Sequence, residues 1–171
     1  FLFLGDVRSS LIVVATLVLT PLLTFIAMNQ FGISANLMSL GGLAIAIGLM
    51  VDGSVVVVEN AYLQLGRVAN KGESQLRVIL HAVVEVATPV IFGVGIIILV
   101  FLPLMTLQGM EGKMFAPLAY TIAIALGISL ILSMTLTPVM STYLLKPPAH
   151  DGDHDTRLIA AMKQRYLKML H

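Results

Sequence analysis

The amino-acid sequence predicts an all-α membrane protein, a polytopic bundle of transmembrane helices. Of its 171 residues 58% are hydrophobic and only 11% are charged, with a mean hydropathy of +0.97. Soluble domains carry about a quarter charged residues, so a soluble fold of this composition would have almost no polar surface. Four apolar runs reach the roughly 20 residues that a membrane-spanning helix needs. Lipid leaves these runs no alternative to a helix, because backbone polar groups find partners only within the segment.

The predicted organisation alternates membrane spans with short connections. We place the four spans at residues 9–31, 36–63, 80–104 and 117–145. The expected connections are a cytoplasmic loop at 64–79, a periplasmic loop at 105–116, and a cytoplasmic linker with a basic amphipathic surface helix at 146–171. Residues 1–8 are interpreted as the end of a preceding transmembrane helix and a cytoplasmic turn. The apolar opening without a methionine indicates a piece of a longer protein.

The distribution of basic residues predicts the orientation of the spans. Lys113 is the one basic residue expected between spans on its side of the membrane. The others all fall on the opposite side: Arg8, Arg67, Lys71, Arg77, Lys146, Arg157, Lys163, Arg165 and Lys168. By the positive-inside rule this second side is cytoplasmic. A formal net charge of only +1 gives no reason to expect a nucleic-acid partner, and the chain has no cysteine for a disulfide or a thiolate metal site.

Glycine and proline distinguish the individual spans. The span at 36–63 contains Gly41, Gly42, Gly48 and Gly53. Glycines let neighbouring membrane helices approach closely, so we expect this span to lie at the centre of the bundle. Pro89 and Pro138 each remove one helix hydrogen bond from their spans and favour a kink.

Asp52 is the residue that most directly suggests a function. It lies midway along its span, inside the run Leu49-Met50-Val51-Asp52-Gly53-Ser54. An acid at a helix centre costs about 2.5–3.5 kcal/mol on insertion scales, which makes it a functional-site hypothesis. Desolvation favours its neutral form and a nearby cation its charged form, so a partner that moves would make it take up and release a proton. The alternative is a static ion pair or hydrogen bond between helices.

Glu59 and Asn60 are candidates to support such a relay. Glu59 follows Asp52 by seven residues, about two turns, and therefore lies on nearly the same face about 10 Å closer to the cytoplasm. The two residues equally well mark a helix end at the membrane interface, where acids are tolerated. Glu85 and His81, near the start of the span at 80–104, are expected to be interfacial.

The sequence contains residue types that can bind metals, but their arrangement does not predict a metal site. The ten methionines suit monovalent copper or silver, but methionine is also a common core filler. A run of acids and histidines follows the last span: His150, Asp151, Asp153, His154 and Asp155. Such a run is more typical of a solvated loop, so we assign no metal-binding residues.

The segment from Gly42 to Asn60 resembles the fourth transmembrane helix of the resistance-nodulation-division (RND) efflux pumps, which carries a run like "AIGLxVDxxVVxxEN". The likeness extends over essentially the whole chain. It takes in Phe1–Arg8 as the end of the second helix, Pro103-Leu104 after the fifth, and Leu136-Thr137-Pro138 in the sixth. Gly53 stands where drug exporters usually have a second aspartate, and Asp-Gly there is similar to the heavy-metal efflux subfamily.

The resemblance implies a function and partners. Asp52 falls on the family's proton-relay aspartate, which implies proton-driven antiport of heavy-metal cations in the bacterial inner (plasma) membrane, with the proton gradient as energy source and no cofactor. It also implies a lysine elsewhere in the protein that pairs with Asp52, and substrate-binding periplasmic domains. Such pumps are homotrimers in the lipid bilayer that join a periplasmic adaptor and an outer-membrane channel.

The resemblance leaves the metal open. Zinc, cobalt and cadmium exporters often carry an acid six residues before the relay aspartate, where this chain has Ala46. Copper and silver exporters place methionines where Met38 and Met50 stand, but their expected partners on helix six fall on Leu126 and Ser141.

Three other readings remain. One is a drug or lipid exporter of the same superfamily, and another is a structural membrane bundle that does not itself transport. The third is an intramembrane aspartyl protease, which needs two carboxylates that share a proton. Only one acid is expected at mid-membrane, so no enzymatic activity is predicted.

Overall fold

The computed structural model describes residues 7–68 and 74–145, and every secondary-structure element in these two ranges is a helix. They are α1 (Val7–Gln30), α2 (Leu37–Val68), α3 (Gln75–Met105) and α4 (Gly109–Leu144). All four are long and apolar enough to cross a membrane. The predicted all-α membrane bundle is therefore confirmed.

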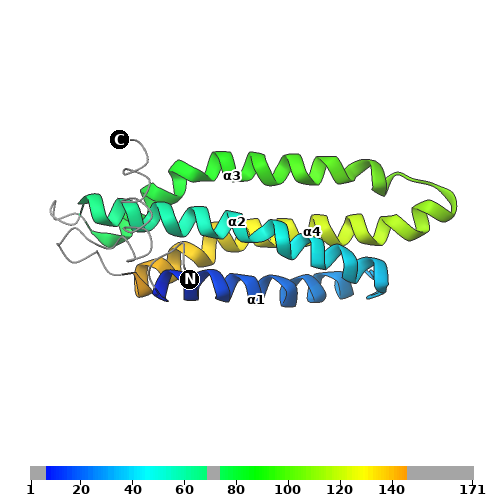
Figure 1. Cartoon of the computed structure of the whole chain (residues 1–171), viewed down its shortest axis with the longest axis horizontal. Coiled ribbons are helices and arrows are strands. Elements are labelled where there is room, and N and C mark those ends of the chain that lie inside the picture. Colours follow the sequence, from blue (N-terminus) through cyan, green and yellow to red (C-terminus); the bar gives the residue numbers. More distant parts are fainter. Residues whose placement is uncertain (1–6, 69–73, 146–171) are drawn as a thin grey trace, which may run out of the picture.

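The four helices form an elongated bundle with α2 and α4 in its middle (Figure 1). Each of these two packs against the other and against both α1 and α3. The helices α1 and α3 flank the central pair and do not contact each other. The central position of α2 agrees with its high glycine content.

The helices extend beyond the apolar runs from which the spans were predicted. Within the described ranges, α2 continues past residue 63 to Val68, α3 begins at Gln75 instead of 80, and α4 begins at Gly109 instead of 117. The length of an apolar run is matched to the hydrocarbon core of the membrane, which is about 30 Å thick. A helix of 31 residues, such as α3, is about 46 Å long. Polar helix ends therefore extend past the apolar part. Residues 146–171, with the predicted linker and surface helix, lie outside the described residues.

A tight connection joins α1 to α2. Gly32 adopts a positive φ of 67°, which glycine tolerates without strain. The start of α2 is capped reciprocally, because the Ser39 N–H donates to Asn36 Oδ1 at 2.9 Å and the Asn36 N–H donates to Ser39 Oγ at 2.8 Å. These bonds satisfy backbone N–H groups at the helix start, which have no preceding turn whose carbonyl oxygens could accept from them.

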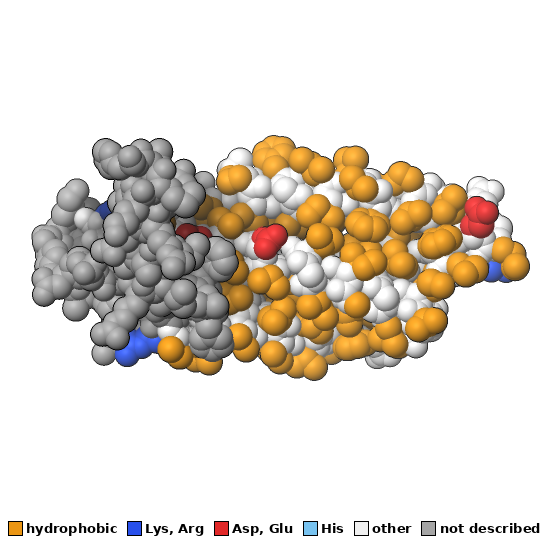
Figure 2. All heavy atoms as spheres, viewed as in Figure 1, with side chains coloured by type: hydrophobic (Ala, Val, Ile, Leu, Met, Phe, Trp, Pro, Cys, Tyr) orange, Lys and Arg blue, Asp and Glu red, His pale blue; other side chains and the backbone are white. Residues whose placement is uncertain are grey.

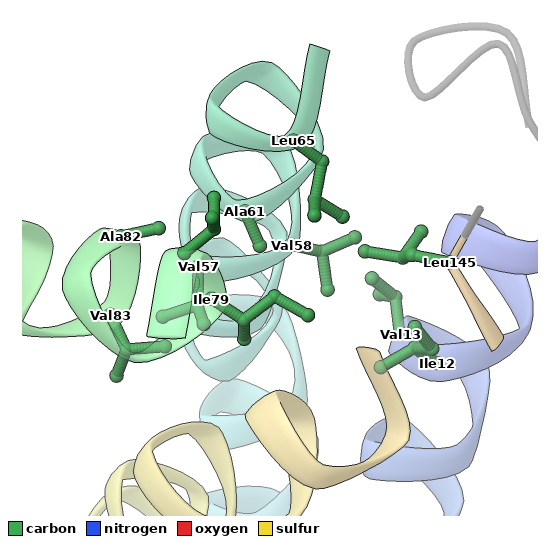
Figure 3. Packing of buried hydrophobic residues seen from close by; sticks show 11 residues of the cluster. Ile12, Val13, Val57, Val58, Ala61, Leu65, Ile79, Ala82, Val83 and Leu145 are labelled. Carbon is green, nitrogen blue, oxygen red and sulfur yellow. The ribbon is translucent and has the colours of Figure 1, made fainter. Parts of the chain in front are cut away.

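The larger core cluster lies where α1 and α3 begin and α2 and α4 end, which we call the basic end because Arg8, Arg67 and Arg77 lie there. All four segments contribute side chains, which converge in Figure 3: Ile12, Val13, Val57, Val58, Ala61, Leu65, Ile79, Ala82, Val83 and Leu145. The Gln75 Nε2 also donates to the Leu145 carbonyl oxygen at 2.7 Å, which joins the start of α3 to the end of α4. The basic end is thus the most tightly packed part of α3.

At Gly42 the backbones of α2 and α4 approach each other closely. A Cβ at this position would lie 2.7 Å from the Leu118 carbonyl oxygen, closer than side chains tolerate. At Gly53 a Cβ would be in ordinary contact with Val90 and Ser133, whereas Gly41 and Gly48 have nothing within 4 Å. Close helix packing therefore requires glycine at one of the four positions.

Replacing Gly42 with alanine is expected to destabilise the bundle by about 1–3 kcal/mol, the usual cost of overpacking. The added methyl group would meet the α4 backbone, which cannot rotate away as a side chain can. Gly41→Ala is the matched control, since it adds the same methyl group into open space and gains roughly 0.5–1 kcal/mol of helix propensity. The midpoint of heat-induced aggregation of the detergent-solubilised protein measures both changes. Equal midpoints for the two variants would contradict the close contact.

Candidate functional site

Asp52 stands at the middle of the 32-residue helix α2, with its side chain exposed. Its neighbours two positions away, Met50 and Ser54, are buried. Two residues correspond to about 200° of helical rotation, so these neighbours point to nearly the opposite side of α2. The carboxylate of Asp52 therefore faces away from the core of the described bundle.

Asp52 belongs to a stripe of exposed residues that follows one face of α2. We call it the Asp52 stripe, and its members are Ile45, Leu49, Asp52, Val56, Glu59 and Leu63. They recur every three or four residues, the spacing of one helix face. Figure 2 shows isolated acidic side chains among apolar ones on the side of the bundle. In hydrocarbon a carboxylate on such a face is unfavourable, so this stripe needs a polar cover or water.

Within residues 7–68 and 74–145, Asp52 has no hydrogen-bond or ion-pair partner. A narrow gap does lie between α1, α2 and α4, lined among others by Thr16, Met50 and Ser54. It is too small to hold a water molecule and lies on the side of α2 opposite to Asp52. Water or a cation can therefore reach the carboxylate only from the exposed side.

Two buried hydroxyl contacts fix α2 against α4 behind Asp52. The Ser54 and Ser133 hydroxyls are hydrogen-bonded at 2.9 Å, and the Ser129 hydroxyl donates to the Met50 carbonyl oxygen at 3.3 Å. Sequence reasoning missed these serines. The signal available was the spacing of Ser129 and Ser133, four residues apart on one helix face within an apolar run.

Glu59 and Asn60 face different directions. Glu59 is exposed on the Asp52 stripe, as the seven-residue spacing predicts. Asn60 is half-buried, and its Nδ2 donates to the Ala82 carbonyl oxygen at 2.8 Å and to Glu85 Oε2 at 3.2 Å. The interpretation of these residues as a helix end is wrong, because α2 continues for two further turns to Val68.

Glu85 is the functional candidate whose contacts the sequence did not reveal. Its Oε2 also accepts a hydrogen bond from Gln64 Nε2 at 2.9 Å, so two amides of α2 converge on one carboxylate oxygen of α3. The sequence signal was the polar spacing of Asn60 and Gln64, one turn apart.

Metal ligands are not gathered in the part of the chain that the structure describes. No group of three or more His, Cys, Asp or Glu side chains there could hold a metal ion. Met50 is buried in an apolar cluster that includes Leu126, and Met38 is half-buried near the start of α2. The run His150–Asp155 lies outside the described residues.

The amino-acid sequence of this chain is similar to those of known efflux and metal-resistance proteins. A sequence model of the AcrB/AcrD/AcrF family matches residues 1–171. Protein HelA of Legionella pneumophila is 43% identical over 177 residues, covering 99% of this chain and 16% of the relative. The cobalt-zinc-cadmium resistance protein CzcA of Cupriavidus metallidurans is 39% identical, with the same two shares covered. The cation efflux system protein CusA of Escherichia coli (strain K12) is 36% identical over 180 residues, covering 99% of this chain and 17% of the relative.

We expect Ser54→Ala and Ser133→Ala each to destabilise the protein, because each leaves the other hydroxyl buried without its partner. In a double-mutant cycle the pair should show a coupling of about 0.6 kcal/mol, the average for interhelical hydrogen bonds in a membrane protein. Thermal stability in detergent is the measurement. Strictly additive losses would show that the two hydroxyls do not interact.

Proposed function

Because this chain belongs to the AcrB/AcrD/AcrF family, the RND transporters, we propose that it forms part of the membrane domain of a proton-driven exporter of heavy-metal cations. In this proposal Asp52 is the proton relay. The chain covers 16–17% of the length of the relatives reported above, so export is assigned to the longer protein that contains it. The names of CzcA and CusA support a cation as the substrate.

The observation that carries the proton step is the exposed carboxylate of Asp52 in the middle of an apolar stripe. It lacks a partner among the described residues, so its charge depends on what another part of the protein places opposite it. Lipid or a dry protein surface favours the neutral acid, whereas a cation or water favours the carboxylate. A partner that approaches and withdraws would therefore load and unload a proton.

A change of charge at Asp52 can act on the rest of the bundle through α2. The Ser54–Ser133 bond ties this part of α2 to α4, so the two helices would shift together. Protonation would weaken the ion pair of Asp52 with a cation of another segment, which the family implies is a lysine. One elementary charge moved through 100 mV supplies about 2.3 kcal/mol, enough to bias a two-state rearrangement. That shift would drive alternating access in distant periplasmic domains.

Glu59 is proposed to extend the relay toward the cytoplasm. It lies on the Asp52 stripe on the side nearer the basic end. By the positive-inside rule the basic end is proposed to be cytoplasmic. Family membership supports the bacterial inner membrane as the proposed location of this multi-pass protein. Two carboxylates about 10 Å apart on one face would mark the wet side of a proton path.

The partners proposed for the full-length protein are those of its family. They are two further copies of the protein in a homotrimer, a periplasmic adaptor and an outer-membrane channel. Family membership is what supports them. The metal itself is proposed only as a heavy-metal cation. Ala46 stands where divalent-metal exporters often carry an acid, and Met50 lies in one buried cluster with Leu126, where monovalent-metal exporters are expected to have a second methionine.

Replacing Asp52 with asparagine is expected to reduce metal resistance and metal-linked proton movement to the level of cells without the protein. The change keeps the size of the side chain and removes its titratable group. The measurement is metal tolerance together with proton flux in vesicles that contain the full-length protein. Asp52→Glu is the matched control, since it keeps a carboxyl group and should retain partial activity.

Export by the inserted Asp52→Asn protein at the wild-type rate would show that Asp52 has a structural role. A third outcome is that Asp52→Asn abolishes proton movement while proton movement by the wild-type protein does not depend on added metal. That outcome would favour a drug or lipid exporter.

The variant Glu59→Gln should reduce proton-linked export several-fold, less than Asp52→Asn, because Glu59 supports the path without being its central group. Initial rates of proton flux in the same vesicles give the comparison. Wild-type rates for Glu59→Gln would remove it from the relay.

A further inference from the structure

A set of polar contacts joins α2 to α3 close to the proposed relay. We call it the clamp and define it as Asn60 and Gln64 of α2 with Glu85 of α3. The Asn60 and Gln64 side-chain amides donate to Glu85 Oε2 at 3.2 and 2.9 Å. Asn60 also donates to the Ala82 carbonyl oxygen at 2.8 Å, so the clamp includes the α3 backbone. These three bonds are directional, unlike the apolar contacts around them.

Glu85 is an exposed carboxylate on a helix that is long and apolar enough to cross a membrane. It lies five residues inside the apolar run predicted to begin at residue 80, about 7.5 Å along the helix axis. A carboxylate next to hydrocarbon is unfavourable unless it has partners. Both of its side-chain donors come from α2, the helix that carries Asp52.

The clamp lies beside the part of α3 that holds its fully buried residues, among those that the structure describes. The buried residues of α3 are Val78, Ile79, Ala82 and Val83, all within its first three turns. Beyond them α3 runs along the α2 and α4 pair (Figure 1). Most of its side chains there are exposed, and a few pack against a second apolar cluster: Val94, Ile97, Ile98 and Phe101. The basic end of α3 is therefore the part that can hold α2 in a defined orientation.

The geometry of a helix connects the clamp to Asp52. Asn60 follows Asp52 by eight residues, which corresponds to a rotation of about 80° between the two side-chain directions. Because the backbone between them is a continuous helix, a contact that fixes Asn60 toward α3 also fixes the direction of Asp52. Glu59, adjacent to Asn60, is fixed in the same way. A rotation of α2 that turned Asp52 toward another partner would have to stretch or break the clamp.

We propose that Glu85 is a positioning residue for the relay, which sets the rotation of α2 on α3 through Asn60 and Gln64. This inference rests on the proposed function of Asp52. Glu85 touches neither the metal nor the proton path in this role. It acts on the rate at which α2 changes orientation, and therefore on turnover and not on metal affinity.

The test uses the full-length protein in vesicles, with initial rates measured against metal concentration and divided by the amount of inserted protein. Glu85→Gln keeps the shape of the side chain and removes the charge that strengthens both bonds. Gln64→Glu places a second carboxylate opposite Glu85 and removes one donor. We expect each single variant to reduce turnover roughly tenfold, as loss of hydrogen bonds to a charged group would, with KM for the metal unchanged.

The exchange variant Gln64→Glu/Glu85→Gln is the matched control. It restores an amide opposite a carboxylate with the two positions reversed, and its α3 amide oxygen can still accept from Asn60. We expect turnover to recover to within about threefold of wild type, because coupled residues show strongly non-additive effects. The exchange variant contains the same three side-chain types as the natural clamp, one carboxylate and two amides, so its net charge equals that of the wild type.

Three results would overturn the proposal. The first is wild-type turnover for inserted Glu85→Gln, and the second is an exchange variant no better than the worse single variant. The third is that the single variants lower, and the exchange variant restores, only the amount of inserted protein, while turnover per molecule equals that of the wild type in all of them. The clamp would then be a contact needed for folding. Asp52→Asn in the same assay separates the two hypotheses. If it transports normally the proposed relay fails, whereas an inactive Asp52→Asn beside a normal Glu85→Gln removes only the clamp.

Discussion

The close packing of α2 on α4 is the constraint on which the rest of this structure depends. It requires a glycine at position 42, where the Leu118 backbone leaves no room for a Cβ, and it is fastened at mid-helix by the Ser54–Ser133 bond. The helices α1 and α3 attach to this central pair and not to each other. The face of α2 that does not contact α4 is consequently left outside, and Asp52 lies on that face.

The kinds of polar side chain that are buried in the bundle depend on whether they can form hydrogen bonds without water. The buried threonine hydroxyls on α1 donate to carbonyl oxygens of their own helix, as Thr20 does to Thr16 and Thr24 does to Thr20, both at 2.7 Å. A hydroxyl can be satisfied in this way by one preceding turn, whereas a carboxylate needs several donors or water. Threonine is therefore accommodated within the described core, and the acids of the described spans lie at its surface. The surface acids become available for chemistry with other segments.

Asn60 shows how a structural contact and a proposed relay are combined on one helix. It is adjacent in sequence to Glu59, yet the two side chains face different surroundings because each residue turns by about 100° around the helix. One of them anchors α2 on α3 and the other shares the exposed stripe with Asp52. Any motion of α2 that changes the surroundings of the acids also acts on the anchor.

The sequence by itself determined the helical class, the number of long apolar helices in the described residues, and the height of Asp52 along α2. These properties depend on the apolar composition of each segment, which must be helical in lipid, and on the fixed rise per residue of a helix. Both can be read from a single segment of the sequence without its tertiary contacts. It did not determine where helices end, since polar residues continue a helix past the hydrocarbon. Only the tertiary structure decided which way Asp52, Glu59 and Asn60 face. That direction is set by the rotation of α2, which depends on partners such as Ser133 and Glu85 that are 79 and 25 residues away from their contacts in the chain.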